Sequence, residues 1–479
     1  MTSSLITRRN FIKGSTSVIA LASFPGLAFA QTPPRLEWQQ FIDPSTNRLQ
    51  LFKDTVRTMR ANTNSNSPLS WAYWVNAHVN YCPHGSPYFL AWHRGYLYYF
   101  EQQLRAIAGP SLSLPYWDYY KYPRIPAEFT NSSSTNSLYV SRTGSNVYSA
   151  LSLAPFSSTV INFQRNTSNA FEPSIESAPH NPVHNLIGGE MANMTSPRDP
   201  IFFLHHCNID RLWNAWVQAG GKRVPYTSNP FNSTTSNAYW SGTFRYGPTM
   251  TIEKYKTYTP GWLGASYGDN TQPRSLPPSA KSSSPFKMVQ ATFRTPPAAR
   301  NFPPAAARAI SAGRRSLGGV SSVVLDESSV SARLPVSASD VQAVQSAVSA
   351  ALSPPAQLAP DAARSIKVIL DGLQLLGSGA KGGYFYNIYL NLPDVIEDGQ
   401  KYLLGTVGPF EIAGASHHGP ATLEFPATEV LSHLSSSELQ QVTVSFERIS
   451  GESAPRGPVL RIGEVRVEIS TDAPWEPNP

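Results

Sequence analysis

Histidine side chains are concentrated in residues 180–216 of this chain. His180 and His184 are four residues apart, which places two imidazoles on one face of a helix with about 5–6 Å between their Cβ atoms. His205 and His206 follow at the end of an apolar run. Helices seldom bury adjacent histidines without a use for them. The pattern therefore predicts that this stretch supplies several imidazoles to one metal ion.

Two helices must position these histidines. Asn181-Pro182 has the residue types of an N-cap and a first helical position, and Gly188-Gly189 is a typical stop, so a short helix should begin beside His180. Asp199-Pro200 begins a second helix in the same way, and Gly220-Gly221 ends it. This second helix carries the adjacent pair of histidines inward.

A second cluster comprises His78, His84 and His93. Nine residues at about 100° each would point His84 and His93 to opposite sides of one helix, so His84 must precede the helix that carries His93. Ser86-Pro87 provides the expected start of that helix. His78 should come from the end of an earlier helix that opens at Ser67-Pro68. The chain then offers two sets of three imidazoles.

The composition of these clusters favours copper. Hydrolytic zinc sites usually add a carboxylate or a general base, and non-haem iron oxygenases use two histidines and one carboxylate. Neither stretch contains H-E-x-x-H or H-x-D. Two sites of three histidines, each with an open position, favour a pair of copper ions that binds dioxygen between them.

Two segments resemble the copper-A and copper-B motifs of the tyrosinase, catechol oxidase and hemocyanin family: FLAWHR at 89–94, and DPIFFLHH at 199–206 followed by NIDRLW at 208–213. The resemblance implies two copper ions, held by His78, His84 and His93 (copper A) and by His180, His184 and His206 (copper B). His206 is preferred to His205 because the family's ligand lies four residues before the Asp, here Asp210. His205 would then line the site or support a ligand.

Cys82 stands two residues before His84, which is similar to the Cys-x-His thioether crosslink of some family members. A plain buried thiol is the alternative. The only other cysteine, Cys207, also lies beside a proposed ligand, so a disulfide between the two is a third possibility in an oxidising compartment.

Glu176 and Asn181 occupy the positions where the family carries a Glu and an Asn that hold a water and help to deprotonate a monophenol. The alternative is that Glu176 is solvated and Asn181 only caps its helix. Some family members cover copper A with a Phe from the loop before the last histidine. The corresponding residues 191–194 contain no aromatic side chain, which favours an open site.

By this resemblance the chain is a tyrosinase, which uses dioxygen to hydroxylate small monophenols and to oxidise o-diphenols to o-quinones. A catechol oxidase without monophenolase activity has the same ligands. A hemocyanin-like dioxygen carrier is disfavoured by the single copper domain and by an export signal. That signal is Thr7–Lys13 (TRRNFIK), a twin-arginine motif followed by a modest apolar stretch and Ala28-Phe29-Ala30, a small-x-small cleavage site.

The apolar stretch after the twin arginines is too short and too interrupted by Gly and Pro for a stable membrane span. We therefore expect a bacterial protein that is exported to the periplasm or secreted. The formal net charge is +7, and no run of Lys and Arg with interleaved aromatic residues occurs. Nucleic acid is thus not an expected partner.

Composition divides the chain into a signal peptide (1–30), a Trp- and Tyr-rich core (31–270), a Pro-, Ser- and Ala-rich linker (271–315) and a β-rich domain (316–472). The core is predicted to be mainly α, a four-helix bundle around the dinuclear copper site. A dibasic pair, Arg314-Arg315, is a candidate cleavage point in the linker.

Beyond residue 316, short alternating segments bounded by Gly, Pro and Ser predict a β-sandwich. The predicted strands are Ser322–Leu325, Ile366–Leu370, Tyr384–Leu392, Gln441–Arg448 and Val459–Ile469, and a helix is expected over Val341–Leu352 with Asp340 as its cap. In the family such a domain lies over the copper site and keeps the enzyme latent until it is removed.

Overall fold

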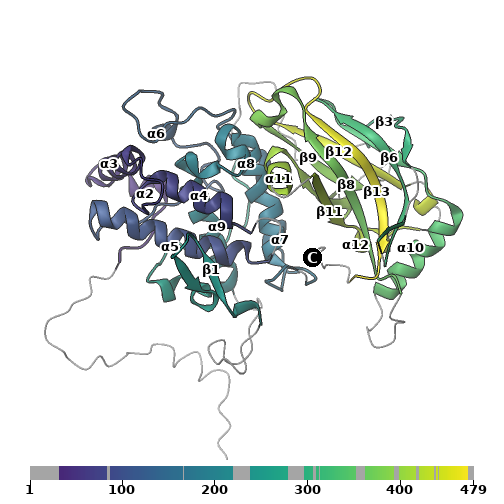
Figure 1. Cartoon of the computed structure of the whole chain (residues 1–479), viewed down its shortest axis with the longest axis horizontal. Helices are drawn as coiled ribbons and strands as arrows, with labels where there is room; N and C mark the ends of the chain where they lie inside the picture. The colour runs from purple at the N-terminus through teal and green to yellow at the C-terminus, as the bar shows by residue number, and fades with distance from the viewer. Residues whose placement is uncertain are drawn as a thin grey trace, which may run out of the picture.

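A helical core and a domain built mainly of strands lie side by side in the computed structural model of the chain (Figure 1). The structure describes residues 32–83, 87–165, 167–219, 238–278, 296–305, 309–311, 313–351, 362–392, 399–416, 420–435, 438–440 and 442–472. The predicted signal peptide, His84 and Gly220-Gly221 lie outside these ranges. Among the described residues, no helix is both long and apolar enough to cross a membrane.

The core contains the helices α2 (Trp38–Phe41), α3 (Arg48–Ala61), α4 (Trp71–Tyr81), α5 (Phe89–Ala108), α6 (Ala127–Thr130), α7 (Phe171–Ile175), α8 (Asn181–Ile187) and α9 (Ile201–Gln218). A small hairpin of β1 (Thr243–Arg245) and β2 (Thr251–Glu253) follows them. Aromatic side chains hold α5 against α9: the rings of Phe100 and Phe203 stack with centroids 3.6 Å apart. The predicted mainly helical core is confirmed.

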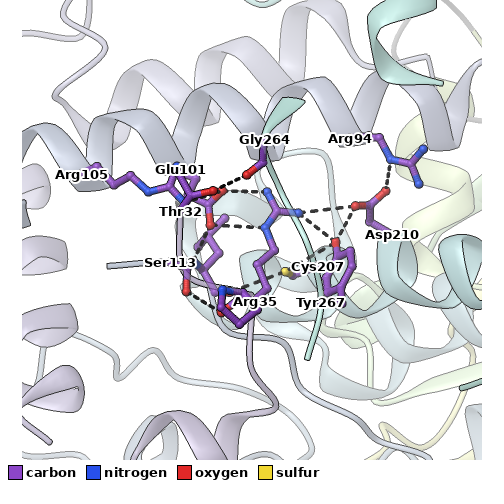
Figure 2. Close-up of polar contacts among 12 residues, drawn as sticks. Thr32, Arg35, Arg94, Glu101, Arg105, Ser113, Cys207, Asp210, Gly264 and Tyr267 are labelled. Carbon is purple, nitrogen blue, oxygen red and sulfur yellow. Dashed lines mark hydrogen bonds and ion pairs between the residues drawn. The ribbon is translucent and has the colours of Figure 1, made fainter. Parts of the chain in front are cut away.

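Buried charged side chains also join α5 to α9 (Figure 2). Asp210 of α9 accepts hydrogen bonds from Arg94 Nε at 2.6 Å and from the Tyr267 hydroxyl, and Arg35 Nη1 lies 3.4 Å from its Oδ2. Arg35 also pairs with Glu101 of α5, with 3.1 Å between Nη2 and Oε2. The four charged side chains are at most 2% exposed.

The C-terminal domain consists of two sheets. The five-stranded sheet has the order β10 (Leu403–Val407), β9 (Tyr384–Leu390), β12 (Val442–Ser450), β7 (Val330–Leu334), β3 (Ala299–Arg300). The six-stranded sheet has the order β11 (Ala421–Pro426), β8 (Ser365–Leu375), β13 (Leu460–Ser470), β6 (Arg314–Leu325), β4 (Pro304–Ala305), and β5 (Ala309–Ser311) pairs with β6. Buried side chains of both sheets form one hydrophobic cluster, as predicted for a β-sandwich.

Residues assigned to the linker by composition include strands of this sandwich. β3 pairs with β7 and β4 pairs with β6, both before residue 316. The dibasic pair is the beginning of β6, where Arg314 contacts Glu424 and Glu468. Arg315 pairs with Asp340. The prediction of a cleavage point at this pair was therefore wrong, because strand pairing and ion pairs hold both arginines in the folded sheet.

Three helices accompany the sheets: α10 (Ala338–Ala351), α11 (Pro409–Ala415) and α12 (Thr428–Ser432). The first confirms the predicted amphipathic helix, but Asp340 was wrongly predicted as its cap: it lies in the first turn, where its N–H donates to Ser337 Oγ at 3.2 Å. The helix α11 was not predicted. Figure 1 shows α11 beside α8, at the boundary between the two domains. The position of α11 is decisive for the site described below.

The charged cluster around Asp210 gives a first prediction. Asp210→Asn leaves Arg94 and Arg35 buried without their shared countercharge, and breaking a buried ion pair in this way costs about 3–5 kcal/mol. We expect a clear fall in the thermal midpoint of unfolding. As a control, Asp54→Asn breaks an exposed pair with Arg57 on α3 and should cost less than about 1 kcal/mol. Equal effects of the two substitutions would contradict a structural role for the buried charges.

Candidate metal centre

Three imidazoles from residues 180–206 point their Nε2 atoms at one place. His180 and His184 come from the start and the second turn of α8, and His206 comes from α9. His206 Nε2 lies 3.3 Å from His180 Nε2 and 3.3 Å from His184 Nε2. All three side chains are fully buried. The arrangement matches the predicted copper-B set.

Hydrogen bonds on the far side of two of these rings fix their orientation. The Nδ1 atom of His184 lies 2.7 Å from the carbonyl oxygen of Met191, and Nδ1 of His180 lies 2.8 Å from Oδ1 of Asn181. A carbonyl oxygen can only accept, so Nδ1 must carry the proton and Nε2 the lone pair. The lone pairs of His180 Nε2 and His184 Nε2 both face His206 Nε2 at hydrogen-bond distance. A cation bound between these nitrogen atoms would stabilise this geometry.

The cluster that contains His78 and His93 is built in the same way. His78 Nδ1 lies 2.8 Å from the carbonyl oxygen of Met194, and His93 Nδ1 lies 2.8 Å from that of Phe89. Cys82 Sγ is 3.5 Å from His93 Nε2. These three side chains form a group that could hold a metal ion, and His180, His184, His205 and His206 form a second. His84, the remaining predicted ligand, lies outside the described residues.

The two clusters share one apolar interior. The His93 and His206 rings stack with centroids 4.1 Å apart and 14° between their planes. Burial lowers the pKa of His78 to about 4 and holds the pKa values of His93, His184 and His206 well below their usual range. These imidazoles are therefore neutral at physiological pH, which is the form that binds metals.

His205 and the two cysteines can also be placed. The His205 ring stacks on His180 with centroids 5.2 Å apart and lies 4.9 Å from the His184 ring, so it packs against two of the predicted copper-B ligands. Neither cysteine is in a disulfide bond in the structure. Cys207 Sγ contacts the Leu114 carbonyl and the Tyr267 hydroxyl, each at 4.0 Å, and the possible disulfide to Cys82 is therefore not formed.

The simpler alternative for Glu176 and Asn181, a solvated carboxylate and a helix cap, is not what the structure contains. Glu176 is 3% exposed and therefore not solvated; its Oε2 contacts Arg165 Nη2 in an ion pair. Asn181 is the first residue of α8, not a side-chain cap, and its Oδ1 faces His180 as described. Neither the ion pair nor this use of the amide was predicted.

An aromatic side chain from the C-terminal domain covers the cluster. Phe410, on the unpredicted helix α11, stacks on His184 with centroids 4.0 Å apart and 16° between the planes, and contacts His180 at 5.6 Å. The sequence favoured an open site because residues 191–194 lack an aromatic residue. The covering ring instead comes from a segment more than two hundred residues later in the chain.

Polar contacts fix α11 in this position. Asn185 of α8 accepts a hydrogen bond from Phe410 N at 2.9 Å and donates one to Glu411 Oε2 at 2.7 Å. The backbone carbonyl oxygen of Asn185 accepts a further hydrogen bond from Gly383 N at 2.7 Å. A Cβ atom at Gly408 would lie 2.5 Å from the Asn185 side chain, so this close approach requires glycine. Only Gly408-Pro409, a typical helix start, hinted at α11 in the sequence.

A helical core with two adjoining groups of buried imidazoles has the architecture of a candidate metal centre. The family profile described as the common central domain of tyrosinase matches residues 52–150 and 126–219. The helical core of this chain belongs to the tyrosinase family, a dinuclear copper family.

Curated relatives agree with this assignment. A tyrosinase of Hahella sp. (strain CCB-MM4) is 35% identical over 30% of this chain and 40% of its own length. Catechol oxidase B of Solanum tuberosum is 31% identical over 35% of this chain and 38% of its own length. The chain thus spans about two fifths of these relatives. The match to the structure of latent apple tyrosinase covers 94% of this chain and 99% of that chain, with a TM-score of 0.51 and 19% identity. This match supports the two-domain fold.

A buried carboxyl group near the clusters leads to a pH prediction. Glu172 of α7 accepts hydrogen bonds from the backbone N–H groups of Leu90 and Arg165, both at 3.2 Å. Burial nevertheless raises its pKa to about 7. The folded chain therefore binds this proton more tightly than the unfolded chain. The stability gained from neutral Glu172 is present at low pH and is lost as the pH rises through about 7.

The glutamine in Glu172→Gln cannot ionise. The stability of this variant relative to the parent should therefore be higher at pH 8 than at pH 5. We expect the difference in thermal midpoint between variant and parent to move by a few degrees in that direction between the two pH values. Glu190→Gln, at a side chain that is 33% exposed, is the control and should show no such trend. A pH-independent difference for Glu172→Gln would contradict the assignment.

Proposed function

We propose that this chain is a dinuclear copper oxidase of phenols. It would use dioxygen to hydroxylate monophenols at the ortho position and to oxidise o-diphenols to o-quinones. The convergence of the His180, His184 and His206 Nε2 atoms, with Nδ1 of His180 and His184 directed at oxygen atoms, is the observation that carries this proposal. His78, His84 and His93 would hold the second ion.

Copper, when bound, would supply the redox chemistry and the dioxygen-binding position, whereas the protein supplies orientation and an apolar surrounding. The carbonyl groups of Met191, Met194 and Phe89 hold the imidazole rings, so that each presents a lone pair without reorganisation. His205 would line the place where a phenol ring docks. The crosslink from Cys82 to His84 and export by the twin-arginine route remain part of the proposal on the sequence alone.

An o-diphenol oxidase without monophenolase activity is the second candidate, and one observation favours it. Hydroxylation of a monophenol is expected to need help with removal of the phenolic proton, and Glu176 with Asn181 would provide it. In the structure Arg165 contacts the Glu176 carboxylate and Asn181 faces His180. Both groups are thus engaged with other residues.

Oxygen uptake by copper-loaded protein distinguishes these candidates. With 4-methylphenol and 4-methylcatechol as a matched pair, we expect uptake on both, slower on the monophenol. Uptake on the diphenol alone would make the chain a catechol oxidase. His206→Ala should lower the bound copper below two ions per chain and abolish uptake. Two bound copper ions without uptake on either substrate, both in the intact chain and in a Phe410→Ala variant that lacks the covering ring, would contradict the oxidase proposal and favour a dioxygen carrier.

We also infer that the C-terminal domain keeps the enzyme latent. The Phe410 ring lies parallel to the His184 imidazole, where a phenolic ring would have to approach. The hydrogen bonds of Asn185 to Phe410 and Glu411, and those of Glu452 to Ser145 N at 2.9 Å and to Arg124 Nη1 at 2.7 Å, support a docked resting state.

Phe410→Ala removes the covering ring while leaving the backbone bond to Asn185 in place. We expect oxygen uptake on 4-methylcatechol by the uncut chain to rise by about tenfold, mainly through a lower KM, because access no longer requires displacement of the ring. Phe302→Ala, a half-buried aromatic residue of the same domain that packs on the sandwich core, is the matched control and should leave uptake unchanged. Equal uptake by the Phe410 variant and its parent would count against latency.

A further inference from the structure

Arg165 lies between two buried carboxyl groups on the segment that leads into α8. Its Nη2 contacts Oε2 of Glu176, and its backbone N–H donates to Oε2 of Glu172 at 3.2 Å. The other oxygen of Glu172 accepts from Leu90 N in the first turn of α5, the helix that carries His93. Arg165 is therefore linked to the segment that leads into α8 and, through Glu172, to α5, which are two of the elements that present proposed ligands.

The burial of this ion pair distinguishes it from an ordinary surface contact. The Glu176 side chain is 5% exposed and that of Arg165 is 20% exposed. Exposed pairs contribute little, but a carboxylate removed from water depends on its partner for charge compensation and orientation. The guanidinium contacts one of the two Glu176 oxygens, so that this oxygen is engaged with Arg165 rather than available to a water or a substrate proton.

We infer that Arg165 is a positioning residue that restrains Glu176 as a proton acceptor and thereby shifts the site toward o-diphenols. The inference rests on the proposed function. For a monophenol to be hydroxylated, its hydroxyl proton passes, directly or through a water, to the Glu176 carboxylate and leaves the substrate as a phenolate. A guanidinium on that carboxylate makes this transfer less favourable, whereas o-diphenol oxidation would depend on it less.

The test compares rates of oxygen uptake on 4-methylphenol and 4-methylcatechol for copper-loaded, full-length protein, in the parent chain and in the Phe410→Ala background. Arg165→Gln should raise the ratio of kcat on the monophenol to kcat on the diphenol by about tenfold, within the range that one general base contributes. The KM for the diphenol should stay within about twofold. Arg165→Lys keeps the charge without the planar fork and should give an intermediate ratio.

A double variant shows whether Arg165 acts through Glu176. In Arg165→Gln/Glu176→Gln the gain in the ratio should disappear. Arg57→Gln removes the same charge from an exposed pair on α3 and should leave the ratio unchanged. Copper content and circular dichroism establish that each variant folds; if Arg165→Gln does not fold, Arg165→Lys carries the test.

The outcomes separate this inference from the proposed function. A ratio at or below that of the parent in every folded Arg165 variant, with diphenol uptake intact, would overturn the inference alone. The same holds if the gain persists without the Glu176 carboxylate. Lack of uptake on both substrates by the parent and by the Phe410→Ala variant, with two copper ions bound, would remove the proposed function and the inference with it.

Discussion

The contact between Asp210 and Arg94 determines how the two longest helices of the core face each other. Arg94 follows His93 on α5, and Asp210 lies one turn after His206 on α9. Because an unpaired charge in this interior would be very costly, the Arg94–Asp210 contact permits one register of α5 against α9. That register brings the His93 and His206 rings into a stack. The distance between the two histidine clusters therefore depends on the Arg94–Asp210 ion pair. Arg35 and Tyr267 add the two ends of the core to the same cluster (Figure 2).

Within that frame, backbone carbonyl groups orient most of the imidazoles. Met191, Met194 and Phe89 each use a carbonyl oxygen for an Nδ1 atom, and these oxygens belong to loops or helix turns whose places are set by packing. Rings held in this way cannot turn away from one another to relieve the approach of their lone pairs. The folded chain thus stores an arrangement that a bound cation stabilises, and binding of that cation should in turn stabilise the fold.

Most of this arrangement was predictable from local sequence rules. The spacing of His180 and His184, the need for His84 to precede α5, and the strands β6, β8, β9, β12 and β13 follow from helix and strand periodicity, whereas β7, β10 and β11 were not predicted. The missed features depend on contacts between segments that periodicity cannot pair. Arg165 reaches Glu176 across a loop, and Phe410 reaches α8 from a residue 225 positions away from Asn185. Asn181 was misassigned because an Asn before a Pro satisfies a capping rule, while the nearby imidazole offers its side chain a better partner.

The interface between the domains combines tight fit with polar bonding. Glycines at 382 and 408 let the two backbones approach, since a Cβ atom at either position would collide with α8 or the glycine that follows it. Hydrogen bonds to Asn185, Ser145 and the backbone fix the approach, and Phe385 and Ile449 of the C-terminal domain add apolar contacts with the hydrophobic cluster of the helical core. The sandwich buries a hydrophobic cluster of its own between its two sheets, and Phe410 is not part of that cluster. Separation of the domains would therefore cost polar contacts that water can replace and the burial of these two apolar side chains, while most of each hydrophobic core would remain buried. A lid of this kind can leave without unfolding, which is the property that latency requires.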